Sequence, residues 1–334
     1  MSSATSKERH AVCAEETTAP SKQAHRRKVS WLPAQHGTWM MMAVPFILGG
    51  IGGTWAWQHA ILAMLWLCGY CCFFAFSAWA AQLRKVRGRK NRVRNQASTP
   101  FFVWFTATVL AGLATLICAP QLLPWLIVFA PVAVVSLVQT CAHRIRSLLT
   151  RSCEVVAAGL MCAVAWHMGA LSAHSFLGWE KPFNPLLAFF SREQVTGAGG
   201  VAWEWISSWA ATIPLGAIYA TIAVTAYFWS TIPFVKSLMR ERNSRPYHFL
   251  VIFSHAGFLV VACALAVCGY ASFPLVIFWL IVAIRAWIFT ELSRAIFAGK
   301  DRNIHLSPKQ LLMFVGITET ILSIVYIPVV LASV

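Results

Sequence analysis

The chain has 334 residues, of which 58% are hydrophobic and only 11% are charged, and its mean hydropathy is +0.65. A soluble domain usually carries about 25% charged residues, so this composition argues against a soluble protein and predicts an integral membrane protein. The formal net charge is +16. Because the basic residues are spread between apolar segments, we expect anionic lipid headgroups as their partner and no nucleic acid.

Residues 1–30 are polar and basic, and they lack the apolar segment and cleavage site of a secretory signal. We expect them to form a disordered tail. The remainder, residues 31–334, is expected to be a single transmembrane domain, because a spanning helix needs about 20 apolar residues and nine such segments occupy most of it.

The expected fold is all-α, a bundle of about nine transmembrane helices. The predicted spans cover residues 37–57, 59–82, 99–119, 121–142, 153–172, 211–235, 247–270, 271–292 and 310–332. Gly49 and Gly53 in the first span form a GxxxG pair, which predicts close helix packing. Between the fifth and sixth spans lies an outer loop at about 173–210, whose Trp203, Trp205 and Trp209 are typical of an interfacial anchor.

The basic residues determine the expected orientation. Of the 27 Lys and Arg residues, 24 fall in the N-terminal tail and in the four loops at 84–94, 144–151, 236–245 and 294–309. With nine spans, all five of these segments lie on the same side of the membrane. Positive residues stay in the cytoplasm, so we expect a cytoplasmic N-terminus and a multi-pass protein of the inner (plasma) membrane.

Ionisable residues within apolar spans are costly and therefore indicate candidate functional positions. Six of them fall in the half of the spans nearer the basic loops: His36, Glu154, His255, Arg285, Glu291 and Glu319. We interpret them as lining a polar cavity open to the cytoplasm. The alternative for Arg285 and Glu319 is an ion pair that holds two helices together, and the alternative for His255 is a hydrogen-bonded packing residue.

A second pattern lies in the loop after the sixth span. Lys236, Arg240 and Asn243 recur at helical spacing and would share one helix face, where charge-assisted hydrogen bonds can hold a phosphate. The alternative is that these charges only set the topology. Cys68, Cys71 and Cys72 also share a face, but cysteine is common in buried helices. We therefore expect packing there, and neither a metal nor a cofactor.

Three stretches resemble the YwiC-like family of bacterial integral membrane proteins. They are residues 31–39 (WLPAQHGTW) followed by Pro45 and Gly49, residues 234–242 (FVKSLMRER) and residues 316–319 (GITE). The resemblance runs from about residue 31 to the end of the chain. It implies a multi-pass membrane protein and no particular reaction, so the catalytic residues stay unknown.

A weaker architectural analogy is to the UbiA-type prenyltransferases, which also have nine spans and place their active-site loops after the second and sixth. Those loops carry Asp-rich motifs for Mg²⁺ and diphosphate, whereas Asp301 is the only Asp of this chain. That reaction is therefore not expected. Our first hypothesis is an anionic or lipid-phosphate ligand bound by His36, Lys236, Arg240, Asn243, His255, Arg285 and Glu319. The alternatives are a small-molecule or ion transporter, and a non-catalytic accessory or assembly protein with a membrane protein partner.

Overall fold

The computed structural model describes residues 31–33, 36–87, 98–145, 147–172, 206–239, 241, 244–298 and 308–334. Every regular element in these residues is a helix, which confirms the expected all-α class. The N-terminal tail, Trp203 and Trp205 lie outside the described residues, so the interpretations given to them stay predictions.

In the part of the chain that the structure describes, nine α-helices correspond one to one to the nine predicted spans. They are α1 (His36–Gly53), α2 (Gln58–Arg87), α3 (Ser98–Cys118), α4 (Trp125–Cys141), α5 (Leu148–Ser172), α8 (Leu215–Met239), α9 (Arg245–Val267), α10 (Phe273–Ala298) and α11 (Pro308–Leu331). A short 3₁₀ helix, η1 (Pro120–Leu122), joins α3 to α4. Seven of the nine are long and apolar enough to cross a membrane, and the protein is therefore a multi-pass membrane protein.

Helices α1 and α4 are the two shorter ones, with 18 and 17 residues. At 1.5 Å per residue they are about 26 Å long, slightly less than the hydrocarbon thickness of about 30 Å. Both pack against α5, which is buried along most of its length. The central helix thus has protein rather than lipid on much of its surface.

Close contact between α1 and α5 depends on glycine. A Cβ atom on Gly49 would overlap the carbonyl oxygen of Cys162, and one on Gly53 would overlap the carbonyl oxygen of Trp166. From the other side, a Cβ on Gly169 would overlap the carbonyl oxygen of Gly53. The GxxxG prediction of close packing is therefore confirmed, and α5 is the partner.

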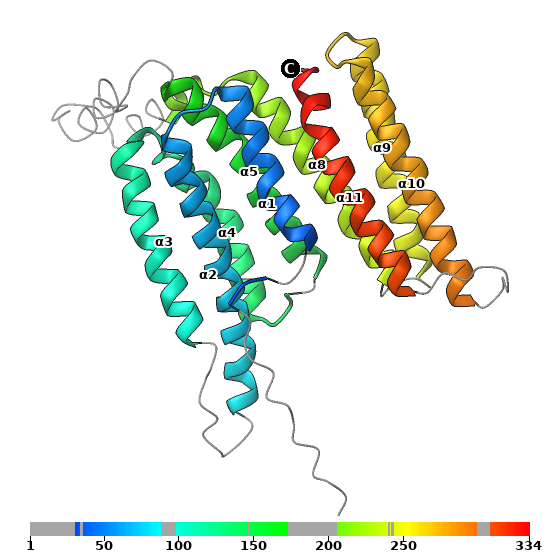
Figure 1. Cartoon of the computed structure of the whole chain (residues 1–334), viewed down its shortest axis with the longest axis horizontal. Helices are drawn as coiled ribbons and strands as arrows, with labels where there is room; N and C mark the ends of the chain where they lie inside the picture. The colour runs from blue at the N-terminus through cyan, green and yellow to red at the C-terminus, as the bar shows by residue number, and fades with distance from the viewer. Residues whose placement is uncertain are drawn as a thin grey trace, which may run out of the picture. The chain divides into compact units, whose positions relative to one another are not determined.

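The helices after the outer loop form the second part of the bundle. Helix α8 packs against α5, α9 and α10, and α11 packs against α1 and α10. In Figure 1, α2, α3 and α4 lie to one side of α5, whereas α9 and α10 lie beyond α8 and α11. The largest buried cluster centres on Tyr227 of α8, Phe278 and Trp279 of α10, and Tyr326 of α11.

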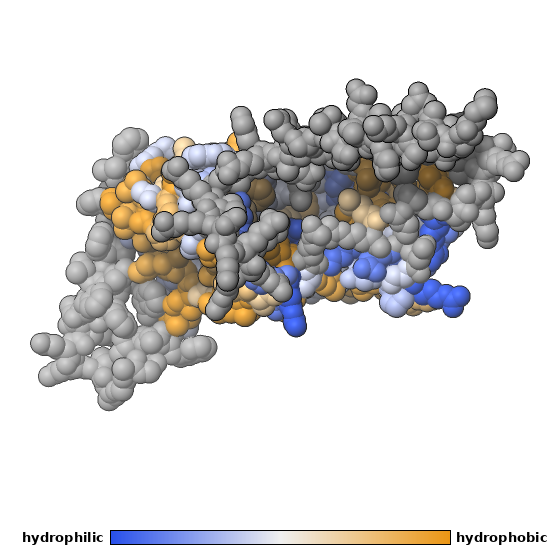
Figure 2. Space-filling view, turned by 90° about the horizontal axis from the view of Figure 1, so that it is seen from below, coloured by the Kyte–Doolittle hydropathy of each residue, from blue (hydrophilic) through white to orange (hydrophobic). Residues whose placement is uncertain are grey.

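Helices α2, α4, α8 and α10 finish at the same end of the bundle, where α3, α5, α9 and α11 begin (Figure 1). We call this the basic end, because the basic loops adjoin it. Viewed from there, hydrophilic side chains lie among the apolar flanks of the helices (Figure 2). A polar end between apolar flanks is the surface expected of a protein that crosses a bilayer.

Candidate functional site

An ion pair between two membrane helices is the centre of the candidate site. The Nη1 atom of Arg285 on α10 lies 2.6 Å from the Oε2 atom of Glu319 on α11. The two side chains are only 7% and 14% exposed. By helix rise, they lie about 15 to 20 Å from the ends of α10 and α11 at the basic end. The pairing proposed from sequence is thus present in the structure.

Two further helices contribute to this group. The Phe234 ring of α8 is fully buried, and the guanidinium carbon of Arg285 lies 4.7 Å from its centroid. His255 of α9 meets the same ring edge-on at a centroid distance of 6.2 Å. Both the histidine and the arginine therefore contact the Phe234 ring, whose face attracts the cation. We call Phe234, His255, Arg285 and Glu319 the charged cluster.

Most of the polar atoms of the charged cluster have no hydrogen-bond partner. His255 uses Nδ1 to donate to the carbonyl oxygen of Val251 at 2.8 Å, and its buried Nε2 has no partner. The ion pair is close but not aligned as a hydrogen bond, so the three guanidinium nitrogens and both Glu319 oxygens also lack an aligned one, although the Tyr227 hydroxyl lies near enough to Glu319 to interact with it. A buried unsatisfied polar group costs about 1–3 kcal/mol, and more when charged. This cluster therefore has unused capacity to bind a polar ligand.

Two layers of apolar side chains enclose the charged cluster. Seven residues further from the basic end, about 10 Å along each helix, lie Tyr227, Phe278 and Tyr326, which pack with centroids 4.5 to 5.5 Å apart. We call these three residues the aromatic layer. One turn nearer the basic end lies a basic-side layer formed by Leu238, Val251, Phe289 and Val315.

Of the other predicted ligand residues, the structure describes the side chain of Lys236 alone. Lys236 lies in the last turn of α8, with its Nζ 5.8 Å from the centroid of the Tyr247 ring. Arg240, Asn243 and the side chain of His36 lie outside the described residues. Their shared helix face and their role in anion binding stay predictions.

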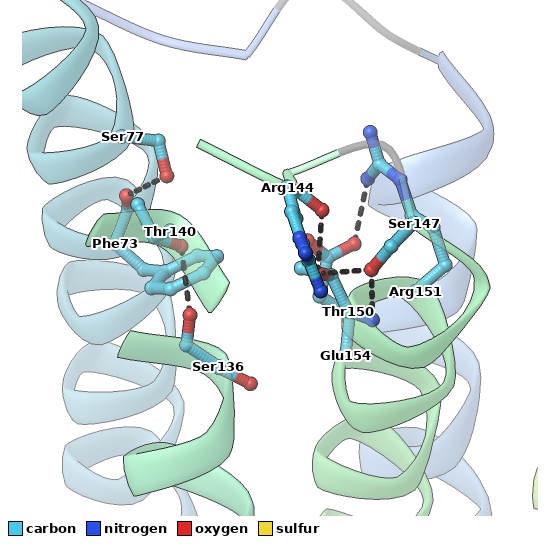
Figure 3. Close-up of polar contacts among 9 residues, drawn as sticks. All are labelled: Phe73, Ser77, Ser136, Thr140, Arg144, Ser147, Thr150, Arg151 and Glu154. Carbon is cyan, nitrogen blue, oxygen red and sulfur yellow. Dashed lines mark hydrogen bonds and ion pairs between the residues drawn. The ribbon is translucent and has the colours of Figure 1, made fainter. Parts of the chain in front are cut away.

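Glu154 belongs to a separate polar group at the start of α5. Its Oε2 accepts from Arg151 Nη1 at 2.6 Å (Figure 3). Ser147 caps α5: its Oγ accepts the Thr150 backbone N–H at 3.0 Å, and the Thr150 hydroxyl donates to the Arg144 carbonyl oxygen. These bonds complete the helix start, so this group has a structural role.

Glu291 also lies apart from the charged cluster. Near the basic end of α10 its Oε1 lies 3.5 Å from His248 Nε2 of α9 and 3.6 Å from Arg294 Nη1. Of the six ionisable residues predicted to line one cavity, the five whose side chains the structure describes are therefore divided among separate groups. Among these five, only Arg285, Glu319 and His255 come together within the bundle.

A polar network that sequence reasoning missed surrounds His167, which is fully buried. Its Nδ1 accepts from Trp125 Nε1 at 3.1 Å, and its Nε2 lies 2.8 Å from Thr212 Oγ1. The Thr212 hydroxyl donates to the Trp209 carbonyl oxygen, so Nε2 carries the proton and donates to Thr212. Both ring nitrogens are satisfied, and Trp209 packs inward against this histidine. His167 is thus a structural residue.

An apolar groove of about 310 Å³ lies between α5, α8 and α9. Its lining residues are Val156, Leu160, Thr221, Ile222, Thr225, Ala226, Trp229 and Phe258. None of the predicted ligand residues is among them. The groove is therefore distinct from the charged cluster.

Residues 32–166 match the family model described as YwiC-like protein. This part of the chain is similar to that family. The match begins within the predicted opening signature and ends in α5, so the matched region contains α1 to α4 and most of α5. No curated protein and no solved structure matches the chain. The resemblance of residues 234–242 and 316–319 to the YwiC-like family, and the analogy to the UbiA-type enzymes, stay predictions.

Proposed function

We propose that the protein binds a phosphate-type anion at the charged cluster, with Arg285 as the anchor. The observation that carries this proposal is the state of the guanidinium group, which is buried and close to one carboxylate, yet has no aligned hydrogen bond on any nitrogen. Arginine presents a planar set of donors that fits phosphate and carboxylate oxygens. An anion would supply the acceptors that Glu319 alone does not.

The same geometry assigns supporting roles. The Phe234 ring covers one face of the guanidinium, which leaves the edge of the plane for an anion. Glu319 is the resident counter-ion that the anion replaces. The aromatic layer closes the site on its far side, so the anion enters from the basic end, past Leu238 and Val315 of the basic-side layer.

The positive-inside rule supports the inner (plasma) membrane with the basic end in the cytoplasm. Anionic lipid headgroups gather at such a basic surface, and their phosphate groups have the required chemistry. A lipid phosphate and free phosphate would present the same oxygens to Arg285.

Binding to purified protein tests the proposal. Native mass spectrometry of gently solubilised protein is carried out with phosphatidic acid in one arm and inorganic phosphate in the other. Arg285→Gln should weaken binding about 10- to 100-fold, the loss expected for a hydrogen-bonded charged contact. Arg294→Gln, the same change on the same helix outside the cluster, should leave it unaltered.

The two arms of this experiment distinguish a lipid phosphate from free phosphate as the ligand. Retention of phosphatidic acid alone identifies a lipid headgroup, and retention of both probes indicates that the phosphate group is sufficient. If neither probe binds the wild-type protein, or if Arg285→Gln binds as well as wild type, the proposal is wrong.

A second candidate function is transport, and one observation favours it. Pro233 lies inside α8 next to Phe234, and proline removes a helix hydrogen bond and permits bending. The hydroxyl groups of Ser230, Thr231 and Ser237 donate to carbonyls three residues earlier, which also bends helices. Bending there would move Phe234 away from Arg285. Phosphate counterflow in proteoliposomes tests transport, and its absence under both anion and proton gradients would reject it.

A further inference from the structure

Anion binding at Arg285 raises a question of charge balance inside the bundle. Arg285 and Glu319 together are neutral while both are ionised. An anion added to this pair would leave one uncompensated negative charge, which is costly to bury. Either the carboxylate must leave the interior or it must become neutral.

Glu319 has little room to leave. It lies on α11 with its side chain 14% exposed, between the aromatic layer and the basic-side layer. One turn further along the same face, Ser323 lies 3.3 Å from the Tyr227 hydroxyl, so this stretch of α11 is also tied to α8. Neutralisation by a proton requires no such movement.

We propose that Glu319 is a proton-binding site coupled to the anion, so that one proton is taken up with each anion. This inference rests on the proposed function. In the step, the ion pair between Arg285 and Glu319 separates, and an O–H bond forms on the Glu319 carboxyl with a proton from water at the basic end. The anion replaces Glu319 as the counter-ion of Arg285. The net charge of the site stays at zero before and after binding.

The groups on the helices packed against α11 agree with this assignment. Their titratable and charged side chains are His36 on α1, Tyr219, Tyr227 and Lys236 on α8, and Arg285, Glu291 and Arg294 on α10. Among the described side chains, Arg285 alone is in an ion pair with Glu319. Tyr326 of α11 itself donates to the Ala223 carbonyl oxygen. Glu319 is therefore the acidic group whose charge the anion must replace.

His255 is the alternative proton acceptor, through its unpartnered Nε2. Protonation there would add a second positive charge to the cluster that already contains Arg285, whereas protonation of Glu319 removes the charge that competes directly with the anion. A His255→Asn variant separates the two, because its amide can still donate to the Val251 carbonyl while it binds no proton near neutral pH.

Dimethyl phosphate is the suitable probe for the test, because this phosphate diester carries one negative charge across the range of interest and does not itself bind the coupled proton. Its affinity for the full-chain protein in phosphatidylcholine nanodiscs is measured by calorimetry from about pH 5 to pH 8. While Glu319 is ionised in the free protein, uptake of one proton per anion means that affinity falls about tenfold for each unit rise in pH. Glu319→Gln should bind dimethyl phosphate with no such slope, and His255→Asn should keep it.

The wild-type protein alone supplies a second measurement in case Glu319→Gln fails to fold. Binding heats in two buffers of different ionisation enthalpy give the number of protons taken up, and the expected value is about one. Binding that is independent of pH, or a slope that persists in Glu319→Gln, overturns the coupling while leaving the anion site intact. If the wild-type protein binds no dimethyl phosphate at any pH, the anion site and the coupling both fall.

Discussion

Arg285 and Glu319 are the residues on which the functional account depends, and their pairing is predictable from sequence. A charge inside an apolar span needs a partner. Among the oppositely charged residues in the predicted spans, Glu319 is closest in depth to Arg285. The role of Phe234 is not predictable in this way, because an aromatic residue among apolar ones carries no polar signal. His167 likewise has partners that are distant in sequence, such as Trp125 and Thr212, and only folding brings them together.

Removing one member of the ion pair should be more harmful to stability than removing both. Arg285→Met should lower the free energy of unfolding by about 3–5 kcal/mol, because Glu319 is left as an unpaired buried charge. The double variant with Glu319→Met should recover most of that loss. Thermal unfolding of the four proteins in detergent provides the measurement. A double variant that is less stable than either single variant would show that the pair is itself the main stabilising contact.

At the level of helices, hydropathy predicts where apolar segments lie but not where helices end. The sixth span was predicted to finish at residue 235, yet α8 continues to Met239, because a helix can extend beyond its apolar segment into polar residues such as Lys236 and Ser237. The first span was predicted to reach residue 57, yet α1 ends at Gly53. Thr54 has a φ of 73°, and a left-handed residue just after a helix terminates it.

The contact between α1 and α5 gives a prediction with an internal control. Gly53→Ala should lower the free energy of unfolding by about 1–3 kcal/mol, because the added methyl group overlaps the Trp166 backbone. Gly37→Ala, in the same helix, meets nothing within 4 Å and should leave stability unchanged or slightly raised. Equal effects of the two changes in a thermal unfolding assay would contradict this close packing.

For the whole molecule, the sequence predicts nine helices but not their neighbours. In a membrane protein, a helix face that contacts lipid and one that contacts another helix are both apolar. The hydropathy pattern therefore does not identify which helices are in contact. The GxxxG pair predicted a close contact of α1, whereas its partner α5 comes from the structure alone. Equally, the charged cluster depends on four helices meeting, which no single segment of sequence specifies.

The central claim is that all nine helices cross the membrane, the short α1 and α4 included, with Arg285 and Glu319 buried between α10 and α11. Accessibility of single cysteines tests it most directly, in a background whose ten native cysteines are replaced. Cysteines at Leu32, Ser147 and Ser244 should react with a membrane-impermeant reagent from one side, and those at Ser272 and Ser333 from the other. If Leu32 and Ser147 react from opposite sides, α1 or α4 does not cross and the account is contradicted.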